Sequence, residues 1–149
     1  MVFHTEYLSP LGVITLTSDG DALTGLQFRD GGLPSYQDED LPLFRLTKKW
    51  LDLYFSGQQP DFTPPVVLTG TDHQKKVWSA LSAIPYGKTI TYGDLARQLG
   101  TSARAVGSAV SRNPVLLVIP CHRVVGAGDV LTGYAGGEDR KKALLALEK

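Results

Sequence analysis

Short apolar runs separated by turn residues dominate the start of the chain. The runs Phe3–Tyr7, Val13–Ser18 and Leu23–Phe28 are rich in apolar and β-branched residues, and Gly-, Pro- and Asp-containing turns lie between them. In the second run, Ile14 and Leu16 alternate with threonines, as in a strand with one buried face. The pattern predicts an antiparallel meander of about three strands.

After residue 42, the residues expected to be buried recur with helical spacing. They recur three or four residues apart, at Leu43, Phe44, Thr47, Trp50, Leu51 and Tyr54. Gly57 follows where such a helix would end. We expect a loop over Arg29–Asp40 before this helix. After it, the segment Gln58–Pro65 contains three prolines and connects the two halves of the chain.

Two further helical patterns lie at the ends of the second half. Asp72 is predicted to cap the first of them, which runs to Ala83 and ends before the turn Pro85–Gly87. The last pattern, Glu138–Lys149, has acidic residues in its first turn, as expected at a helix N-terminus. Its apolar face is predicted to bury Leu144, Leu145 and Leu147.

Between these patterns, two short helices form a helix-turn-helix signature. Thr91 and Asp94 have the spacing of a capping box, which opens the first helix. Gly100 is placed to end that helix, and the next two residues offer a cap for a second helix over Ala103–Arg112. The signature is typical of DNA-binding proteins, but an ordinary helical hairpin has the same appearance.

The chain length of 149 residues allows one substantial domain or two small subdomains. We predict an α+β fold. A β-rich scaffold subdomain with one helix occupies residues 1–65, and a mostly helical subdomain occupies residues 66–149. Because no apolar run is long enough to cross a bilayer and no signal pattern opens the chain, we expect a cytoplasmic protein. One cysteine and three scattered histidines do not have the spacing of a zinc site, so we predict no metal and no cofactor.

The formal net charge of zero conceals an asymmetry between the two halves. Residues 1–71 carry four Lys/Arg against nine Asp/Glu, a balance of −5, whereas residues 72–149 carry eleven against six, a balance of +5. A basic C-terminal half indicates an anionic partner such as nucleic acid. Electrostatic complementarity between two halves of one protein would give the same numbers.

The only cysteine lies in an apolar run that is interrupted in an unusual way. In the stretch Val118–Val125, a proline precedes Cys121 and His122, which are a nucleophile and a base, and Arg123 then interrupts the run. On its own, the stretch is typical of a core strand with a buried, inert cysteine. A strand would place the Cys and His side chains on opposite faces. This geometry, and the lack of an oxyanion-hole motif, argue against a Cys-His hydrolase.

The predicted helix over residues 103–112 carries almost no bulk besides Arg104 and Arg112. Its small residues are Ala103, Ala105, Gly107, Ser108 and Ala109. Gly107 lowers helix propensity by roughly 0.8–1 kcal/mol relative to Ala, so we expect something to approach the backbone closely. A tightly packed neighbouring helix would explain this, and so would the DNA minor groove, which is about 6 Å wide.

Glycines are concentrated after the cysteine. Residues 126–137 contain five of them, without the Gly-Lys-Ser/Thr pattern of a phosphate-binding loop. Such a segment suits a close-fitting wall around a flat ligand.

Taken together, these motifs resemble the O6-alkylguanine-DNA alkyltransferases, or methylated-DNA–protein-cysteine methyltransferases. The resemblance rests on Asn113-Pro114, on the Pro-Cys-His-Arg-Val-Val run at residues 120–125 and on the segment Gly133–Gly137. It implies repair of double-stranded DNA by irreversible, single-turnover transfer of an alkyl group from O6-alkylguanine to the protein's own cysteine. The base would first flip out through the minor groove. O4-alkylthymine is a further candidate substrate, and we expect a monomer.

The resemblance also implies a role for each residue that matches the family. Cys121 would accept the alkyl group, His122 would act as its base through a water, and Glu148 would orient the imidazole. Tyr92 and Lys141 would hydrogen-bond in the pocket, with Tyr92 helping guanine to leave as a neutral base.

Further matching residues would support the pocket and bind DNA. Asn113 would brace the turn that presents the cysteine, and Arg104 would enter the duplex in place of the extruded nucleotide. The pocket would be lined by Val124, Tyr134, Ala135 and Gly136. The other candidates for DNA contact are Thr101, Ser102, Ala103, Ala105, Gly107, Ser108 and Arg112.

Two binding functions are the alternatives to repair. An alkyltransferase-like protein recognises the lesion without transferring the alkyl group, but another residue, commonly tryptophan, occupies the acceptor position in that group. Cys121 argues against it. A plain helix-turn-helix module would bind DNA with an incidental cysteine.

Overall fold

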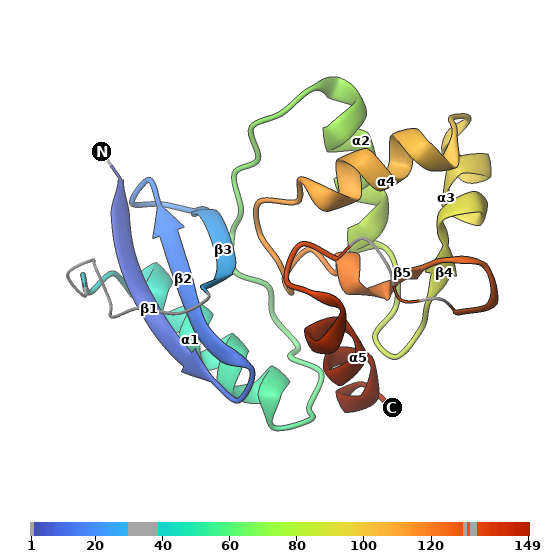
Figure 1. Cartoon of the computed structure of the whole chain (residues 1–149). Helices are drawn as coiled ribbons and strands as arrows, with labels where there is room; N and C mark the ends of the chain where they lie inside the picture. The colour runs from blue at the N-terminus through green and yellow to red at the C-terminus, as the bar shows by residue number, and fades with distance from the viewer. Residues whose placement is uncertain (1, 30–38, 130, 132–133) are drawn as a thin grey trace. The chain divides into compact units, whose positions relative to one another are not determined.

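The computed structural model describes residues 2–29, 39–129, 131 and 134–149. The chain divides into two compact units, Met1–Leu68 and Thr69–Lys149. Most of the predicted loop over Arg29–Asp40, and residues 132–133 of the glycine-rich segment, lie outside the described residues. The fold class is α+β, as predicted, with an antiparallel sheet in the first unit and mostly helices in the second (Figure 1).

The first unit contains the predicted three-stranded meander. Its strands are β1 (Phe3–Ser9), β2 (Gly12–Ser18) and β3 (Leu23–Arg29), in the spatial order β1-β2-β3. Both pairs are antiparallel. Ile14 and Leu16 of the central strand are fully buried, so the alternation with threonine identified the core-facing side of the sheet.

Helix α1 (Pro42–Phe55) contributes an apolar face to the core of this unit. All six residues chosen from the helical spacing are buried. The rings of Trp50 and Tyr54, one turn apart, stack with their centroids 5.4 Å apart. The helix ends at Ser56, and Gly57 follows with a φ of +86°, a left-handed conformation that glycine adopts without strain.

The first unit extends slightly beyond the predicted boundary at residue 65. Val66 bridges to Leu23, whose N–H donates to Pro65 O at 2.8 Å and whose carbonyl accepts from Val67 N at 2.9 Å. These backbone hydrogen bonds attach the end of the predicted connection, and the residues just after it, to β3, and the first unit therefore ends at Leu68.

Three helices of the second unit pack together before the cysteine. They are α2 (Asp72–Ser82), α3 (Tyr92–Leu99) and α4 (Ala103–Ser111), seen together in Figure 1. Gly100 ends α3 in the left-handed conformation, with a φ of +67°, and Ser102 caps α4 by accepting from Ala105 N. The predicted helix-turn-helix geometry is therefore present.

A short parallel pair connects the helices to the cysteine segment. Strand β4 (Ile90–Thr91), directly before α3, pairs with β5 (Val124–Val125), directly after the cysteine segment. This pairing brings the first turn of α3 beside the residues that follow Arg123. The chain then continues through a 3-10 turn, Ala127–Asp129, towards α5 (Glu138–Leu147).

Three local predictions were wrong. The cap of α2 is Thr71, which forms a reciprocal capping box with Gln74, and Asp72 is the first helical residue. The segment Cys121–Arg123 is a 3-10 turn, closed by the hydrogen bond from Arg123 N to Pro120 O at 3.1 Å, and not the core strand that the apolar run indicates on its own. The strand geometry that argued against a Cys-His hydrolase therefore does not apply here.

The third correction concerns α5. Leu144 is fully buried, but Leu145 and Leu147 are only half-buried. The face of the helix that points inward instead buries Lys141, and Glu148 directly after the helix is buried as well. A simple amphipathic pattern could not reveal this face, because two of its members are charged.

None of the helices within the described ranges combines the length and apolar character needed to cross a membrane.

Candidate active site

Asn113 holds together the loop that precedes the cysteine. Its side chain is buried; Nδ2 donates to Ile119 O at 2.8 Å, and Oδ1 accepts from Val115 N at 3.0 Å. Inside this loop Leu117 adopts a left-handed conformation with a φ of +69°, which costs a non-glycine residue roughly 1–2 kcal/mol. The two hydrogen bonds of Asn113 stabilise this tight turn and fix the position of the next segment.

Cys121 is completely buried at the start of the 3-10 turn. Burial raises the pKa of its thiol to about 11, while a hydrogen bond from Asn113 and the charge of Lys141 act in the opposite direction. The group is therefore a neutral thiol at pH 7. Because the thiolate is the reactive form, chemistry at this sulfur requires a base nearby.

His122 is also completely buried and contacts Glu148. Its Nε2 lies 2.5 Å from Glu148 Oε2. Burial lowers the pKa of His122, although the negative charge of Glu148 opposes the shift. The ring is therefore neutral at pH 7. If Nε2–H donates to the carboxylate, the lone pair lies on Nδ1, which makes the imidazole a proton acceptor.

Glu148 is held by more than the histidine. Arg123 Nε donates to Oε1 at 2.9 Å, and the backbone N–H of Gly87 donates to the same oxygen at 3.0 Å. The sequence motifs predicted no function for Arg123 or Gly87. The available signal was the charge inside an apolar run, since a buried arginine requires an ionic partner.

Two tyrosines and a lysine lie near the Cys121–His122 pair. The ring of Tyr134 lies edge-on to His122, with centroids 6.4 Å apart, and Lys141 Nζ lies 5.7 Å from the centre of the Tyr92 ring. Burial, and then the negative charge that Cys121 carries as a thiolate, raise the pKa of both Tyr92 and Tyr134. Both hydroxyls are therefore protonated at pH 7 and available as donors.

The remaining predicted pocket residues differ in exposure. Val124 and Gly136 are buried, whereas Ala135 is exposed. The Gly136 carbonyl accepts from Arg140 Nη1 at 3.1 Å, a contact that attaches the end of the glycine-rich segment to the first turn of α5.

Helix α4 has a buried face and an exposed face, and small residues occur on both. On one face, Ala109 is buried, and its carbonyl accepts from the Trp78 indole of α2 at 2.8 Å. Gly107 faces Tyr92, and a Cβ at this glycine would lie 3.9 Å from the ring, an ordinary contact. Close helix packing therefore explains the buried face. The exposed residues among the DNA-binding candidates are Ser102, Ala103, Arg104, Ser108 and Arg112; the half-buried ones are Thr101, Ala105 and Gly107.

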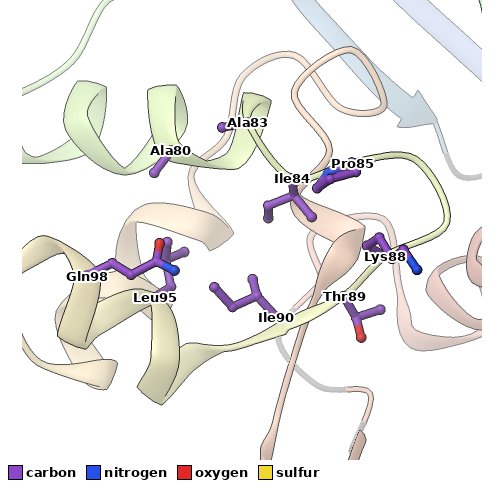
Figure 2. A pocket seen from close by; sticks show the side chains of 9 residues that line it. All are labelled: Ala80, Ala83, Ile84, Pro85, Lys88, Thr89, Ile90, Leu95 and Gln98. Atoms are coloured by element: carbon purple, nitrogen blue, oxygen red, sulfur yellow. The ribbon is translucent and has the colours of Figure 1, made fainter.

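A separate cavity of about 240 Å³ lies between α2, β4 and α3 (Figure 2). Its walls are largely apolar and include Ile84, Ile90 and Leu95. Its lining side chains are not among those assigned to the cysteine site, although the carbonyl of Ile84 accepts from Arg123 Nη1 at 2.8 Å. Over the described part of the chain, no cluster of three His, Cys, Asp or Glu side chains could hold a metal ion.

Two family models together cover nearly the whole chain. The 6-O-methylguanine DNA methyltransferase DNA-binding domain matches residues 72–149, and the ribonuclease-like domain of the same family matches residues 2–68. The chain belongs to the 6-O-methylguanine DNA methyltransferase family. The family that the sequence motifs resemble is thereby confirmed.

Individual relatives are similar over nearly their full length. The methylated-DNA–protein-cysteine methyltransferase of Mycobacterium tuberculosis is 44% identical over 100% of this chain and 93% of the relative. The protein of the same name from Methanosarcina acetivorans is 41% identical over 99% of this chain and 98% of the relative.

Solved structures show the same similarity. The crystal structure of the Mycobacterium tuberculosis O6-methylguanine methyltransferase gives a TM-score of 0.89 at 43% identity, covering 100% of this chain and 93% of that one. A structure of Mycobacterium tuberculosis OGT in complex with DNA gives a TM-score of 0.88 at 43% identity, covering 98% of this chain and 92% of that one.

Proposed function

We propose that this protein repairs alkylated DNA by transferring the alkyl group from O6-alkylguanine to its own Cys121. The observation that carries the proposal is the buried thiol next to a neutral histidine whose Nε2 lies 2.5 Å from a buried carboxylate. Membership in the 6-O-methylguanine DNA methyltransferase family and a DNA complex of a relative support DNA as the partner.

The proposed reaction is a displacement at the alkyl carbon. His122 takes the proton of the Cys121 thiol, through a water, and Glu148 stabilises the imidazolium that forms. The sulfur then forms the S–C bond while the bond from carbon to guanine O6 breaks. The electron pair of that bond moves to the guanine, and Tyr92, whose hydroxyl stays protonated because burial raises its pKa, gives a proton to the leaving base.

The product explains why each molecule would act once. A thioether is a poor leaving group for water, so the alkylated cysteine does not return to a thiol. We propose a stoichiometric reaction, with O4-alkylthymine as a further candidate substrate.

The exposed face of α4 is the proposed DNA-binding surface. Arg104 is exposed in the first turn of this helix, between small neighbours that allow close approach to a groove. Because the reactive atom lies inside the base stack, the nucleotide must flip out, which costs a few kcal/mol. We propose that this occurs through the minor groove, that Arg104 fills the gap and that the protein acts as a monomer in the cytoplasm.

The experiment is intact-mass analysis after incubation with a duplex containing O6-methylguanine in excess. We expect one added methyl group per protein, located on Cys121 by peptide mapping, and none in Cys121→Ser. An unmodified protein that binds the duplex would favour an alkyltransferase-like binding function. Removal of more than one methyl group from the DNA per protein molecule would exclude the single-turnover reaction.

A further inference from the structure

Arg123 is a buried cation whose three guanidinium nitrogens all have partners. Nε donates to Glu148 Oε1 at 2.9 Å and Nη2 to Oε2 at 3.3 Å. Nη1 donates to Ile84 O at 2.8 Å, in the turn that follows α2. The guanidinium carbon also lies 5.6 Å from the centre of the Tyr86 ring. This side chain is therefore fixed in place on every side.

The orientation of the Glu148 carboxylate follows from these contacts. Arg123 binds both oxygens side-on and so defines the plane of the group. Oε2 then faces His122, and Oε1 also accepts from Gly87 N. If the carboxylate rotated away from the imidazole, it would lose the paired contact with Arg123.

Gly87 supports the same carboxylate from the turn after α2. Its φ of +78° belongs to the left-handed region, and a Cβ at this position would lie 3.1 Å from the backbone oxygen of Glu148. Only glycine fits here without displacing the end of α5. The turn and Arg123 thus hold Glu148 from two directions.

We propose that Arg123 is a positioning residue of the transfer reaction, which holds Glu148 against His122 so that the imidazole keeps the orientation and tautomer of a base. The inference rests on the proposed function. It adds a fourth side chain to the Cys121–His122–Glu148 relay, together with the backbone N–H of Gly87.

Arg123 also affects the protonation of the base. Its positive charge contributes to lowering the pKa of His122, after the larger effect of burial and against that of Glu148. If Arg123 loses its charge, the pKa of His122 rises. The acid limb of the rate profile then moves to higher pH, an effect of the lost charge itself, and the double-mutant cycle with Glu148 tests whether Arg123 acts through that carboxylate.

The test uses the full chain and three variants: Arg123→Lys, Arg123→Gln and, as a control, Arg45→Gln. Arg45 is an exposed arginine in the first unit whose ion pair with Asp40 is far more accessible to solvent. Single-turnover transfer from an O6-methylguanine duplex is measured from pH 5 to 9, and the reaction amplitude gives the competent fraction. We expect Arg123→Gln to react about 10²-fold more slowly, Arg123→Lys to be intermediate and Arg45→Gln to be unchanged.

A double-mutant cycle with Glu148→Gln separates the possible causes. If Arg123 acts through Glu148, Arg123→Gln slows the Glu148→Gln protein much less than it slows the wild type. Equal slowing in both backgrounds, or a loss of amplitude with an unchanged rate constant and pH profile, would show a structural role and overturn the inference. If the wild type itself transfers no methyl group, the proposed function fails.

Discussion

The two units of this protein bury different kinds of polar side chain. In the first unit, the buried polar residues among those described are hydroxyl-bearing: Thr5, Ser9, Ser18 and Thr47. In the second unit they are Asn113, His122, Arg123, Lys141 and Glu148. A hydroxyl is satisfied locally, as when Thr47 Oγ1 donates to Leu43 O one turn earlier. A buried charge needs partners from distant parts of the chain and a large compensation for lost hydration.

This difference indicates what each unit contributes. The first unit buries apolar side chains around a sheet and a helix, and its ion pair between Glu6 and Arg29 leaves 22% of the arginine side chain exposed. The second unit removes an arginine, a lysine and a glutamate from water beside a cysteine. Burying these charged groups lowers the stability of the folded state, and such clusters occur mainly at functional sites.

The largest expected effect is on stability. Glu148→Ala leaves Arg123 buried without its carboxylate and should lower the free energy of unfolding by about 3–5 kcal/mol. The matched change in the first unit, Thr47→Val, keeps the shape of the side chain and should cost about 1 kcal/mol or less. Urea unfolding followed by circular dichroism measures both. Equal losses in the free energy of unfolding would contradict the expected difference between a buried charge and a buried hydroxyl.

A pair of glycine substitutions separates the effect of the left-handed conformation from the effect of the contact with Glu148. Gly57 and Gly87 have φ values of +86° and +78°, but a Cβ would meet nothing within 4 Å at Gly57 and the Glu148 backbone at Gly87. Both changes to alanine should cost about 1–2 kcal/mol for the conformation alone. Only Gly87→Ala should also slow methyl transfer, by about ten- to hundredfold. Single-turnover kinetics decides this, and slowing in Gly57→Ala would contradict it.

The sequence predicted the first unit better than the second, for a physical reason. Alternation in β2 and the spacing in α1 depend on local burial, which apolar residues report directly. The contacts of Arg123 span 25 residues to Glu148 and 39 residues to Ile84. No local pattern encodes such pairs. The residues assigned by family resemblance were found only because their motifs occur together.

The charge asymmetry between the halves gives a further prediction about DNA. Arg104→Ala removes an exposed cation from α4 and should weaken binding to lesion-containing DNA by about tenfold, with a smaller salt dependence. Arg45→Gln, an exposed change in the acidic first unit, should leave affinity and salt dependence unaltered. Fluorescence anisotropy at several salt concentrations, in the Cys121→Ser background, measures both. A loss caused by Arg45→Gln would move the binding surface away from α4.

The smallest expected effects concern pH. Because burial lowers the pKa of His122, the folded protein binds fewer protons than the unfolded chain at acidic pH, and stability should fall as the pH drops below the ordinary value of 6.5. Because burial raises the pKa of Cys121 to about 11, the unfolded chain loses the thiol proton first, and stability should also fall as the pH rises from the ordinary pKa of 9.0 to 11.

The rate of methyl transfer should change less than about threefold from pH 7 to 9. A steep rise in that window would indicate a thiol that titrates on its own.

In our mechanism, the buried ionic cluster of the second unit serves the reaction. The most direct test is the single-turnover rate of methyl transfer by Glu148→Gln, corrected for the competent fraction and compared with Thr47→Val. We expect the rate of Glu148→Gln to fall about 10²-fold or more while lesion-DNA affinity changes less than about twofold. Thr47→Val should transfer at the wild-type rate. Full-rate transfer by Glu148→Gln would contradict the relay from Cys121 through His122 to Glu148.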